Sequence, residues 1–289
     1  MPELPEVEVV KRSLTNKIQN LIIKRVEIYD NRLRYTLDRK KIREIIGLKL
    51  KKIKRRSKFL LFYFSKNITM LVHLGMTGKF FFVDQKNIKF KTSFYYDKKE
   101  MKNNIHNRVI FFFNKNNKLI YNDIRKFGFI KILDKKNLEN NLHLKNLGPE
   151  PLGNKFNLMY FAKFIKGRNR TIKDILMDQA FVSGIGNIYA NEILFLSKIK
   201  PSRYVKSIQL FEIKKIVKFT KKILRDAIKF GGSSIRDFSS INGKKGSFQQ
   251  HFNVYGKKDD YCSNRRCKNV IIKLFISKRA TFYCPKCQK

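Results

Sequence analysis

The four cysteines of the chain lie together near its end and are spaced as metal ligands. Cys284 and Cys287 are separated by two residues, the spacing of a zinc knuckle, whereas Cys262 and Cys267 are separated by four. In a reducing compartment this clustering favours one metal site over disulfides, and four thiolates favour zinc. Because a four-thiolate site is closed, we expect one structural zinc ion that holds a hairpin. The longer first spacing leaves four free thiols as the alternative.

The amino terminus combines a potential nucleophile with potential acids and bases. If Met1 is removed, Pro2 carries a free secondary amine at the start of a helix, whose dipole disfavours the protonated amine. Glu3 and Glu6 lie beside it as candidates for proton transfer. The alternative is an acidic helix start without catalytic role, which is common.

A glycine-rich segment in the second half, Gly184-Ile185-Gly186-Asn187, joins two predicted helices. Glycines allow close backbone approach, and the amides at a helix start point toward an anion, so the segment suits a phosphate. A tight turn without ligand is the alternative, because Gly-x-Gly alone is a weak signal.

The elements that must position these residues differ between the two halves of the chain. Up to about residue 130, short apolar runs such as residues 59–64, 70–72 and 109–113 alternate with polar turns, which predicts an antiparallel β-sandwich or barrel. A helix precedes it, with Pro5 in its first turn and apolar residues at helical spacing. The second half is mainly helical, with helices predicted at residues 172–181, 187–197 and 208–230.

These patterns predict an α+β protein with two domains and a terminal metal module. The Pro/Gly cluster Gly148-Pro149-Glu150-Pro151 marks the link between the halves. We expect a β-sandwich domain, a linker, a helical domain and a zinc finger at residues 1–132, 133–152, 153–252 and 253–289, respectively. A chain with 43% hydrophobic residues can fill the cores that this organisation requires.

The charge balance predicts a polyanionic partner. Lys and Arg number 65 against 22 Asp and Glu, for a formal net charge of +43. Nucleic acid is favoured over a membrane surface, since no run of about 18 apolar residues is present. Codon bias is the alternative for part of the excess, because Lys, Asn, Ile and Phe have A/T-rich codons, and we discount about half of the lysine excess for it. The acidic start MPELPEVEVV is unlike a signal peptide and predicts a cytoplasmic protein.

Seven segments together resemble bacterial formamidopyrimidine-DNA glycosylases. They are PELPEVE at 2–8, RRSKFLL at 55–61, HLGMTG at 73–78, NDIRKFG at 122–128, LGPEPL at 147–152, GIGNIYANE at 184–192 and the terminal RATFYCPKCQK. Each motif alone is weak, but their order along the whole chain together with the cysteine module is highly specific. The resemblance implies a β-sandwich, a helix-two-turn-helix domain and a β-hairpin zinc finger.

The resemblance also assigns chemistry. Pro2 attacks the anomeric carbon of the damaged nucleotide and forms an imine, with Glu3 as general acid/base. Glu6 resembles a supporting carboxylate, and Lys58 the lysine that contacts phosphate and assists protonation. Without the resemblance, Lys58 is an ordinary lysine of a basic run. Arg279 resembles the arginine that the zinc hairpin places against DNA for the second elimination.

Further residues match DNA contacts of the family. An extruded nucleotide leaves a gap in the base stack, and a wedge of apolar and hydrogen-bonding side chains fills it. By the resemblance, the wedge consists of Met76, Arg125 and Phe127. His106, Asn169 and Asn187 match DNA-contacting positions, and Arg125 does so as well. The segment from Gly231 to Gly246 corresponds to a loop that covers an extruded purine.

The chain departs from the family in two respects. The first cysteine pair is two residues longer than usual, with Lys268 where Gly commonly follows, so the zinc geometry is less secure than the DNA chemistry. The lysine content is also unusually high, which predicts strong, salt-sensitive binding to nonspecific DNA.

We therefore expect a monomeric, bifunctional glycosylase and abasic-site lyase that acts on oxidised purines in double-stranded DNA. A sister enzyme for oxidised pyrimidines is the nearest rival, although Leu4 favours the purine branch, because the pyrimidine branch typically has Gly there. A noncatalytic DNA-binding protein is the third possibility. The combination of Pro2, Glu3 and Lys58 argues against it, since binding alone needs none of them.

Overall fold

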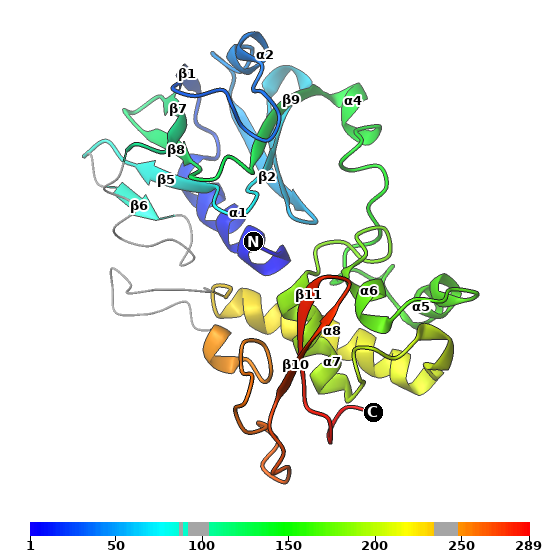
Figure 1. Cartoon of the computed structure of the whole chain (residues 1–289). Helices are drawn as coiled ribbons and strands as arrows, with labels where there is room; N and C mark the ends of the chain where they lie inside the picture. Colours follow the sequence, from blue (N-terminus) through cyan, green and yellow to red (C-terminus); the bar gives the residue numbers. More distant parts are fainter. Residues whose placement is uncertain (87–88, 92–103, 234–247) are drawn as a thin grey trace. The chain divides into compact units, whose positions relative to one another are not determined.

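The computed structural model describes residues 1–86, 89–91, 104–233 and 248–289 (Figure 1). The chain divides into two compact units. The first unit contains Met1–Lys145 with the described residues 230–233, and the second contains Asn146–Lys229 and Phe248–Lys289. The helix and the sheets predicted for the first half of the chain lie in the first unit. The predicted helices and the cysteine module lie in the second.

The first unit begins with helix α1 (Leu4–Ile18), which lies against strands β2 and β3. Pro5 lies in its first turn, where a missing backbone N–H costs nothing. Val7, Val10 and Leu14 recur at helical spacing and are buried, as their periodicity predicts.

Two antiparallel sheets form the body of the first unit (Figure 1). One has the order β1-β7-β8-β5-β6 and the other β2-β3-β4-β9. Residues from both sheets and from α1 belong to a single apolar core, so the predicted sandwich is confirmed. The strands are β1 (Ile23–Ile28), β2 (Leu50–Arg56), β3 (Phe59–Phe64), β4 (Ile68–His73), β5 (Lys79–Val83), β6 (Lys89–Lys91), β7 (Asn107–Phe113), β8 (Lys118–Asn122) and β9 (Phe129–Asp134).

The register of these strands decides which loops meet. Strand β7 pairs with β8 from Asn107↔Asn122 onward, so the segment before β7 lies beside the loop after β8. Two short helices, α2 (Arg39–Arg43) and α4 (Lys135–Glu139), contact β9. Aliphatic side chains make up most of this core, and phenylalanines from the apolar runs at residues 59–64 and 109–113 pack among them.

The second unit is built around helix α7 (Asn187–Ser197), most of whose residues are buried. It packs against α8 (Leu210–Lys229) and α6 (Ile172–Met177), while α5 (Leu158–Ile165) contacts α8. The predicted helix at residues 172–181 ends earlier, at Met177. Asp178 is the C-cap, and its carboxylate accepts from the backbone N–H of Ala180, which favours a turn there.

The chain ends in a β-hairpin of strands β10 (Ile272–Ile276) and β11 (Arg279–Tyr283). Ser277 and Lys278 form its turn, and both have positive φ, as a two-residue hairpin turn with right-handed twist requires. The four cysteines share a small core with Phe195 of α7, so the hairpin module is attached to the central helix. No helix among the described residues is long and apolar enough to span a membrane.

Candidate functional site

The residues that follow Met1 are buried and hydrogen-bonded to one another. Pro2 is buried, and Glu3, with 3% of its surface exposed, is the N-cap of α1. The backbone N–H of Glu3 donates to Glu6 Oε2 (2.9 Å), and the Glu3 side chain accepts from the backbone N–H of Glu6. This reciprocal capping box fixes both carboxylates beside Pro2.

The second oxygen of Glu6 binds a segment that is remote in sequence. Glu6 Oε1 accepts from the backbone N–H of Ser233 (2.7 Å) and from its hydroxyl (3.0 Å). The preceding Gly232 has φ +83°, and a Cβ there would lie 3.0 Å from the same oxygen. Gly232 is therefore required both for its backbone conformation and for this close approach. Glu6 acts in the structure as an anchor, with its two oxygens engaged by different segments.

Lys58 lies in the tight turn between β2 and β3. Ser57 has φ +55°, a left-handed conformation, and its carbonyl accepts from Arg55 Nη1 (2.9 Å). Arg55 Nε in turn donates to Glu8 Oε2 of α1 (3.0 Å). Only 7% of the Lys58 surface is exposed. The sequence suggested an ordinary surface lysine in the absence of the family resemblance, but the fold buries it.

The charges around the first residues show which side chains gather there. Burial lowers the pKa of the α-amino group of Met1 below its usual value, and the carboxylates of Glu3 and Glu6 oppose that shift. The cations of Lys58 and Arg125 lower the same pKa. The predicted site residues that influence the charge of the α-amino group therefore come from three places in the fold. They are Glu3 and Glu6 at the start of α1, Lys58 in the β2–β3 turn and Arg125 in the β8–β9 loop.

The loop between β4 and β5 and the loop between β8 and β9 are hydrogen-bonded to each other beside these residues. Thr77 Oγ1 donates to Asp123 Oδ1 (2.5 Å) and accepts from the backbone N–H of Arg125 (3.0 Å). Asp123 Oδ2 accepts from the backbone N–H of Gly128 (2.8 Å), which closes the β8–β9 loop on itself. A Cβ on Gly75 would collide with the backbone of Phe127, so the two loops are in direct contact.

The three predicted wedge residues project from these joined loops. Met76 is 38% and Phe127 43% exposed, which is high for large apolar side chains. The guanidinium of Arg125 lies 4.5 Å from the centre of the Phe127 ring, in a cation–π arrangement. The structure thus brings Met76, Arg125 and Phe127 onto one exposed surface of the first unit.

The second unit positions its predicted residues around the hairpin. Asn187 Nδ2 donates to the carbonyl of Ala280 (2.9 Å), and its buried Oδ1 accepts no hydrogen bond within the described part of the chain. Lys173, almost fully buried, donates to Ala280 O (3.1 Å) and Thr281 Oγ1 (2.6 Å). Arg279 begins β11 beside these anchored residues and is exposed. Asn187 therefore supports the hairpin in this structure.

Asn169 lies in an exposed loop, and the arginines on either side of it both contact other residues of the second unit. Arg168 Nε donates to Phe164 O (2.6 Å), and Arg170 Nη1 lies 2.6 Å from Asp178 Oδ2. His106 lies just before β7, and its Nδ1 is 3.5 Å from Arg108 Nη2. The predicted loop at residues 231–246 lies outside the described residues from 234 onward.

The four cysteine sulfurs lie within 4.8 Å of one another. Cys262 Sγ is 3.8 Å from Cys287 Sγ, and Cys267 Sγ is 3.6 Å from Cys284 Sγ. A tetrahedral ion with metal–sulfur bonds of about 2.3 Å places its sulfurs about 3.8 Å apart, so the residues fit zinc. The longer first pair is accommodated because residues 263–266 form an exposed turn, closed by a bond from Cys267 N to Asn264 O (2.7 Å).

Two family models match the chain. The formamidopyrimidine-DNA glycosylase N-terminal domain matches residues 1–130, and the formamidopyrimidine-DNA glycosylase H2TH domain matches residues 147–239. The chain belongs to the formamidopyrimidine-DNA glycosylase family. It is 36% identical to the formamidopyrimidine-DNA glycosylase of Roseobacter denitrificans and 38% identical to that of Rickettsia bellii, over the full length of each pair.

Solved structures of the family have the same fold. A complex between the Lactococcus lactis Fpg and an abasic-site-containing DNA matches with a TM-score of 0.84 and 31% identity, over 99% of both chains. A mutant of the same protein in complex with Fapy-dG-containing DNA matches with a TM-score of 0.85 and 31% identity, over both chains in full. Both complexes hold damaged DNA on this architecture.

Some residues of this family member were not identified from the sequence. Lys173 and Ser233 bear on the site only through long-range contacts, to the hairpin and to Glu6, and nothing in their local sequence reveals this. His73 belongs to the HLGMTG segment, but the sequence of this segment does not indicate what His73 does. Its Nδ1 accepts from the backbone N–H of Gly75 (3.1 Å) and so supports the loop that carries Met76.

Proposed function

We propose that the protein is a bifunctional DNA glycosylase and abasic-site lyase of base excision repair, with oxidised purines as its substrates. The observation that carries the proposal is the gathering of Glu3, Glu6, Lys58 and Arg125 around the amino terminus. The amine in this structure belongs to Met1, and removal of Met1 would place the Pro2 amine among the same carboxylates and lysine. Such surroundings suit covalent catalysis, whereas DNA binding alone does not need them. Membership of the family supports the same activity.

In the proposed mechanism, the Pro2 amine that is exposed after removal of Met1 attacks the anomeric carbon of the damaged nucleotide. The bond from that carbon to the base breaks, the base leaves with a proton, and an imine links Pro2 to the opened sugar. Glu3 serves as general acid/base for ring opening and for the proton abstraction that precedes strand cleavage. Lys58 contacts phosphate and assists protonation, and Glu6 supports the site by fixing Glu3.

The wedge residues explain how the base reaches this site. Extrusion of a nucleotide costs a few kcal/mol of lost stacking, and Met76 and Phe127 supply apolar surface to offset it. Arg125 can donate to the partner base that is left behind. Their exposure on joined loops beside the amino terminus suits this role.

The remaining predicted contacts concern the DNA backbone. We propose that His106, Asn169 and Asn187 contact phosphates, and that Arg279 assists the second elimination from the tip of the hairpin. The substrate is damaged double-stranded DNA, bound by a monomer. The proposed β-sandwich domain, helical domain and zinc finger comprise residues 1–132, 153–252 and 253–289, respectively, with a linker at 133–152.

We further propose that Cys262, Cys267, Cys284 and Cys287 hold one structural zinc ion. The sulfur separations suit a tetrahedral ion, and four thiolates this close together repel one another unless a cation lies between them. The ion would rigidify the module that presents Arg279 and would supply no catalytic group.

The zinc proposal predicts one equivalent of tightly bound metal. Elemental analysis of the purified protein should give a zinc-to-protein ratio near one, and Cys267→Ser should lower it severalfold and weaken DNA binding. Met177→Leu, in the same unit but remote in sequence from the module, serves as the control and should leave zinc content unchanged. A protein that contains no zinc when purified without chelators, yet binds DNA fully, would contradict the proposal.

Borohydride trapping tests the function. The protein, shown by mass spectrometry to lack Met1, is mixed with a duplex that carries 8-oxoguanine opposite cytosine and, in parallel, with an oxidised-pyrimidine duplex. We expect a covalent adduct on the purine lesion and none with Pro2→Gly. Adduct formation mainly on the pyrimidine lesion would favour the sister specificity. Tight DNA binding without any adduct would favour a noncatalytic DNA-binding protein.

A further inference from the structure

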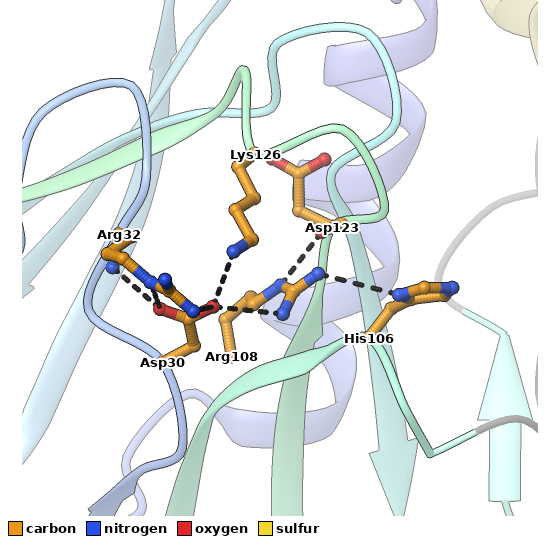
Figure 2. A network of polar contacts seen from close by, with 6 residues as sticks. All are labelled: Asp30, Arg32, His106, Arg108, Asp123 and Lys126. Atoms are coloured by element: carbon orange, nitrogen blue, oxygen red, sulfur yellow. Dashed lines mark hydrogen bonds and ion pairs between the residues drawn. The ribbon is translucent and has the colours of Figure 1, made fainter.

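Asp30 is the centre of a cationic network in the first unit that none of the proposed catalytic steps uses. Its Oδ1 accepts from the backbone N–H and the Nε of Arg32 (2.9 and 3.1 Å). Its Oδ2 lies 3.2 Å from Arg108 Nη1 and 2.7 Å from Lys126 Nζ. Figure 2 shows the three basic side chains converging on this one carboxylate. They hold the pKa of Asp30 well below its usual range, with Arg32 as the largest cause.

Arg108 connects Asp30 to His106, just before β7, and to the β8–β9 loop at residues 123–128, which carries Arg125 and Phe127 and is called the wedge loop below. Its Nε donates to the backbone carbonyl of Asp123 (2.9 Å), the first residue of that loop, and its Nη2 faces His106 Nδ1 at 3.5 Å. A guanidinium donor at Nδ1 favours the tautomer with its hydrogen on Nε2. Only 8% of the Arg108 side chain is exposed, so its charge depends on Asp30 for compensation.

Lys126 connects the same carboxylate to the middle of the wedge loop. It lies between Arg125 and Phe127 in sequence and has φ +57°, a left-handed conformation that is uncommon for residues other than glycine. The bond to Asp30 adds a further attachment in the middle of the loop, besides those at Asp123–Gly128 and at Thr77–Arg125. Arg125 and Phe127 on either side of it are exposed, so the attachment of Lys126 restricts the directions in which these two side chains can project.

We propose that Asp30 is a positioning residue for lesion extrusion. Through Lys126 and Arg108 it holds the β8–β9 loop in the form that inserts Arg125 and Phe127 into the base stack, and it withholds Lys126 from DNA phosphates. This inference rests on the proposed function. Its physical basis is preorganisation, since a loop that is already fixed loses less conformational entropy on insertion.

The physical alternative is a purely structural ion pair. In that case, loss of Asp30 would lower stability without changing how the folded protein handles DNA. The two possibilities differ in whether the loss of Asp30 makes the charge of Lys126 available to DNA. If Asp30 withholds Lys126, its loss frees one lysine for a phosphate contact, and binding to undamaged DNA becomes more salt-dependent.

The test uses Asp30→Asn and Lys126→Gln in the full-length protein. The matched control is Asp134→Asn, because Asp134 is an exposed N-cap without a side-chain capping bond, and Asn is an equally good cap. Extrusion is followed by stopped-flow fluorescence of 2-aminopurine next to a tetrahydrofuran abasic analogue in a duplex, which requires no chemistry. Salt dependence is measured by fluorescence anisotropy on an undamaged duplex.

We expect both Asp30→Asn and Lys126→Gln to slow extrusion at least fivefold, and Asp134→Asn to leave it within twofold of the unmodified protein. The double variant should be no slower than the slower single variant, because Asp30→Asn already removes the contact through which Lys126 acts. The slope of log K against log salt should become steeper by about 1 for Asp30→Asn relative to Asp134→Asn, but not for Lys126→Gln.

Extrusion at the control rate in Lys126→Gln would overturn the proposal, even if Asp30→Asn does not fold, because Lys126 is partly exposed and its loss buries no charge. Additive effects in the double variant would also overturn it. Failure of the proposed function gives a different result. In that case the unmodified protein forms no borohydride adduct, whereas failure of the present inference leaves the adduct intact in every variant.

Discussion

His73 is a residue whose protonation state the fold decides. Its ring stacks on Phe129, with 5.6 Å between ring centres and 19° between planes, and Phe59 lies close by. Burial lowers the pKa of His73 from 6.5 to about 4, and the charges of Lys58, Arg34 and His143 add to the shift. The imidazole is therefore neutral at pH 7, and its Nδ1 is available as the acceptor for Gly75 N–H.

This shift predicts a loss of stability in mild acid. The folded state binds the proton less readily than the unfolded chain, so the contribution of His73 is fully present above pH 6.5 and declines as the pH falls toward about 4. Between pH 7 and pH 5 the unmodified protein should lose about 2 kcal/mol of unfolding free energy more than His73→Gln does. Urea denaturation at both pH values measures the difference.

Exposed His251 in the second unit provides the control for this prediction. His251→Gln should show the same pH dependence as the unmodified protein. An unmodified protein and a His73→Gln variant with parallel stability curves across this pH range would contradict the assigned role of the buried imidazole.

At the scale of elements, helix α1 orders two parts of the site. Its N-cap region holds Pro2 and Glu3, and one turn later Glu8 forms an ion pair with Arg55 of β2. Both partners are largely buried, so removal of one would leave the other charge with less compensation in a poorly solvated place. Arg55 also binds the carbonyl of Ser57, and in this way α1 sets the conformation of the turn that carries Lys58.

This connection predicts that Glu8 influences the reaction without touching the substrate. Glu8→Gln should slow single-turnover adduct formation roughly tenfold to a hundredfold, since a displaced catalytic group costs about that much, while DNA affinity changes little. In a Lys58→Gln background the same substitution should add almost nothing. Exposed Glu44 on the same unit offers a control with the same charge change, Glu44→Gln, for which we expect an unchanged rate. Equal slowing by Glu8→Gln in both backgrounds would show that Glu8 acts independently of Lys58.

At the scale of the whole molecule, the net charge of +43 dominates the interaction with any polyanion. Much of the basic surface lies outside the site. Arg25 and Lys118, for example, flank the half-buried ring of Phe112 at the end of the sheet opposite to the wedge loop. Such charges increase affinity for DNA of any sequence and contribute nothing to the choice of lesion.

The expected consequence is steep salt dependence. For six to ten neutralised phosphates, log K for an undamaged duplex should fall against log salt with a slope of about −5 to −9. The preference for lesion-containing over undamaged DNA should change far less over the same range, because the wedge acts on bases. Anisotropy titrations at several salt concentrations give both quantities. A slope flatter than about −3 would indicate that most of the lysine excess reflects composition alone.

The sequence by itself determined the family and most of the local structure. The cysteine spacing, the motif PELPEVE and the apolar periodicity of α1, α7 and α8 are local signals, because capping, helical spacing and metal ligation depend on residues near one another in the chain. The helical spacing predicts that α6 continues to residue 181, but the helix ends at Met177, because the carboxylate of Asp178 competes with the helix for a backbone N–H.

Only the tertiary structure decided which of these residues act together. Strand register and packing bring Lys58 and Arg125 to the amino terminus, Ser233 to Glu6, and Lys126 and Arg108 to Asp30. These contacts join segments far apart in the chain, and no local pattern marks either partner. Whether a lysine is a solvated surface charge or a buried, oriented group depends on such contacts, because burial and a fixed counter-charge determine its energy.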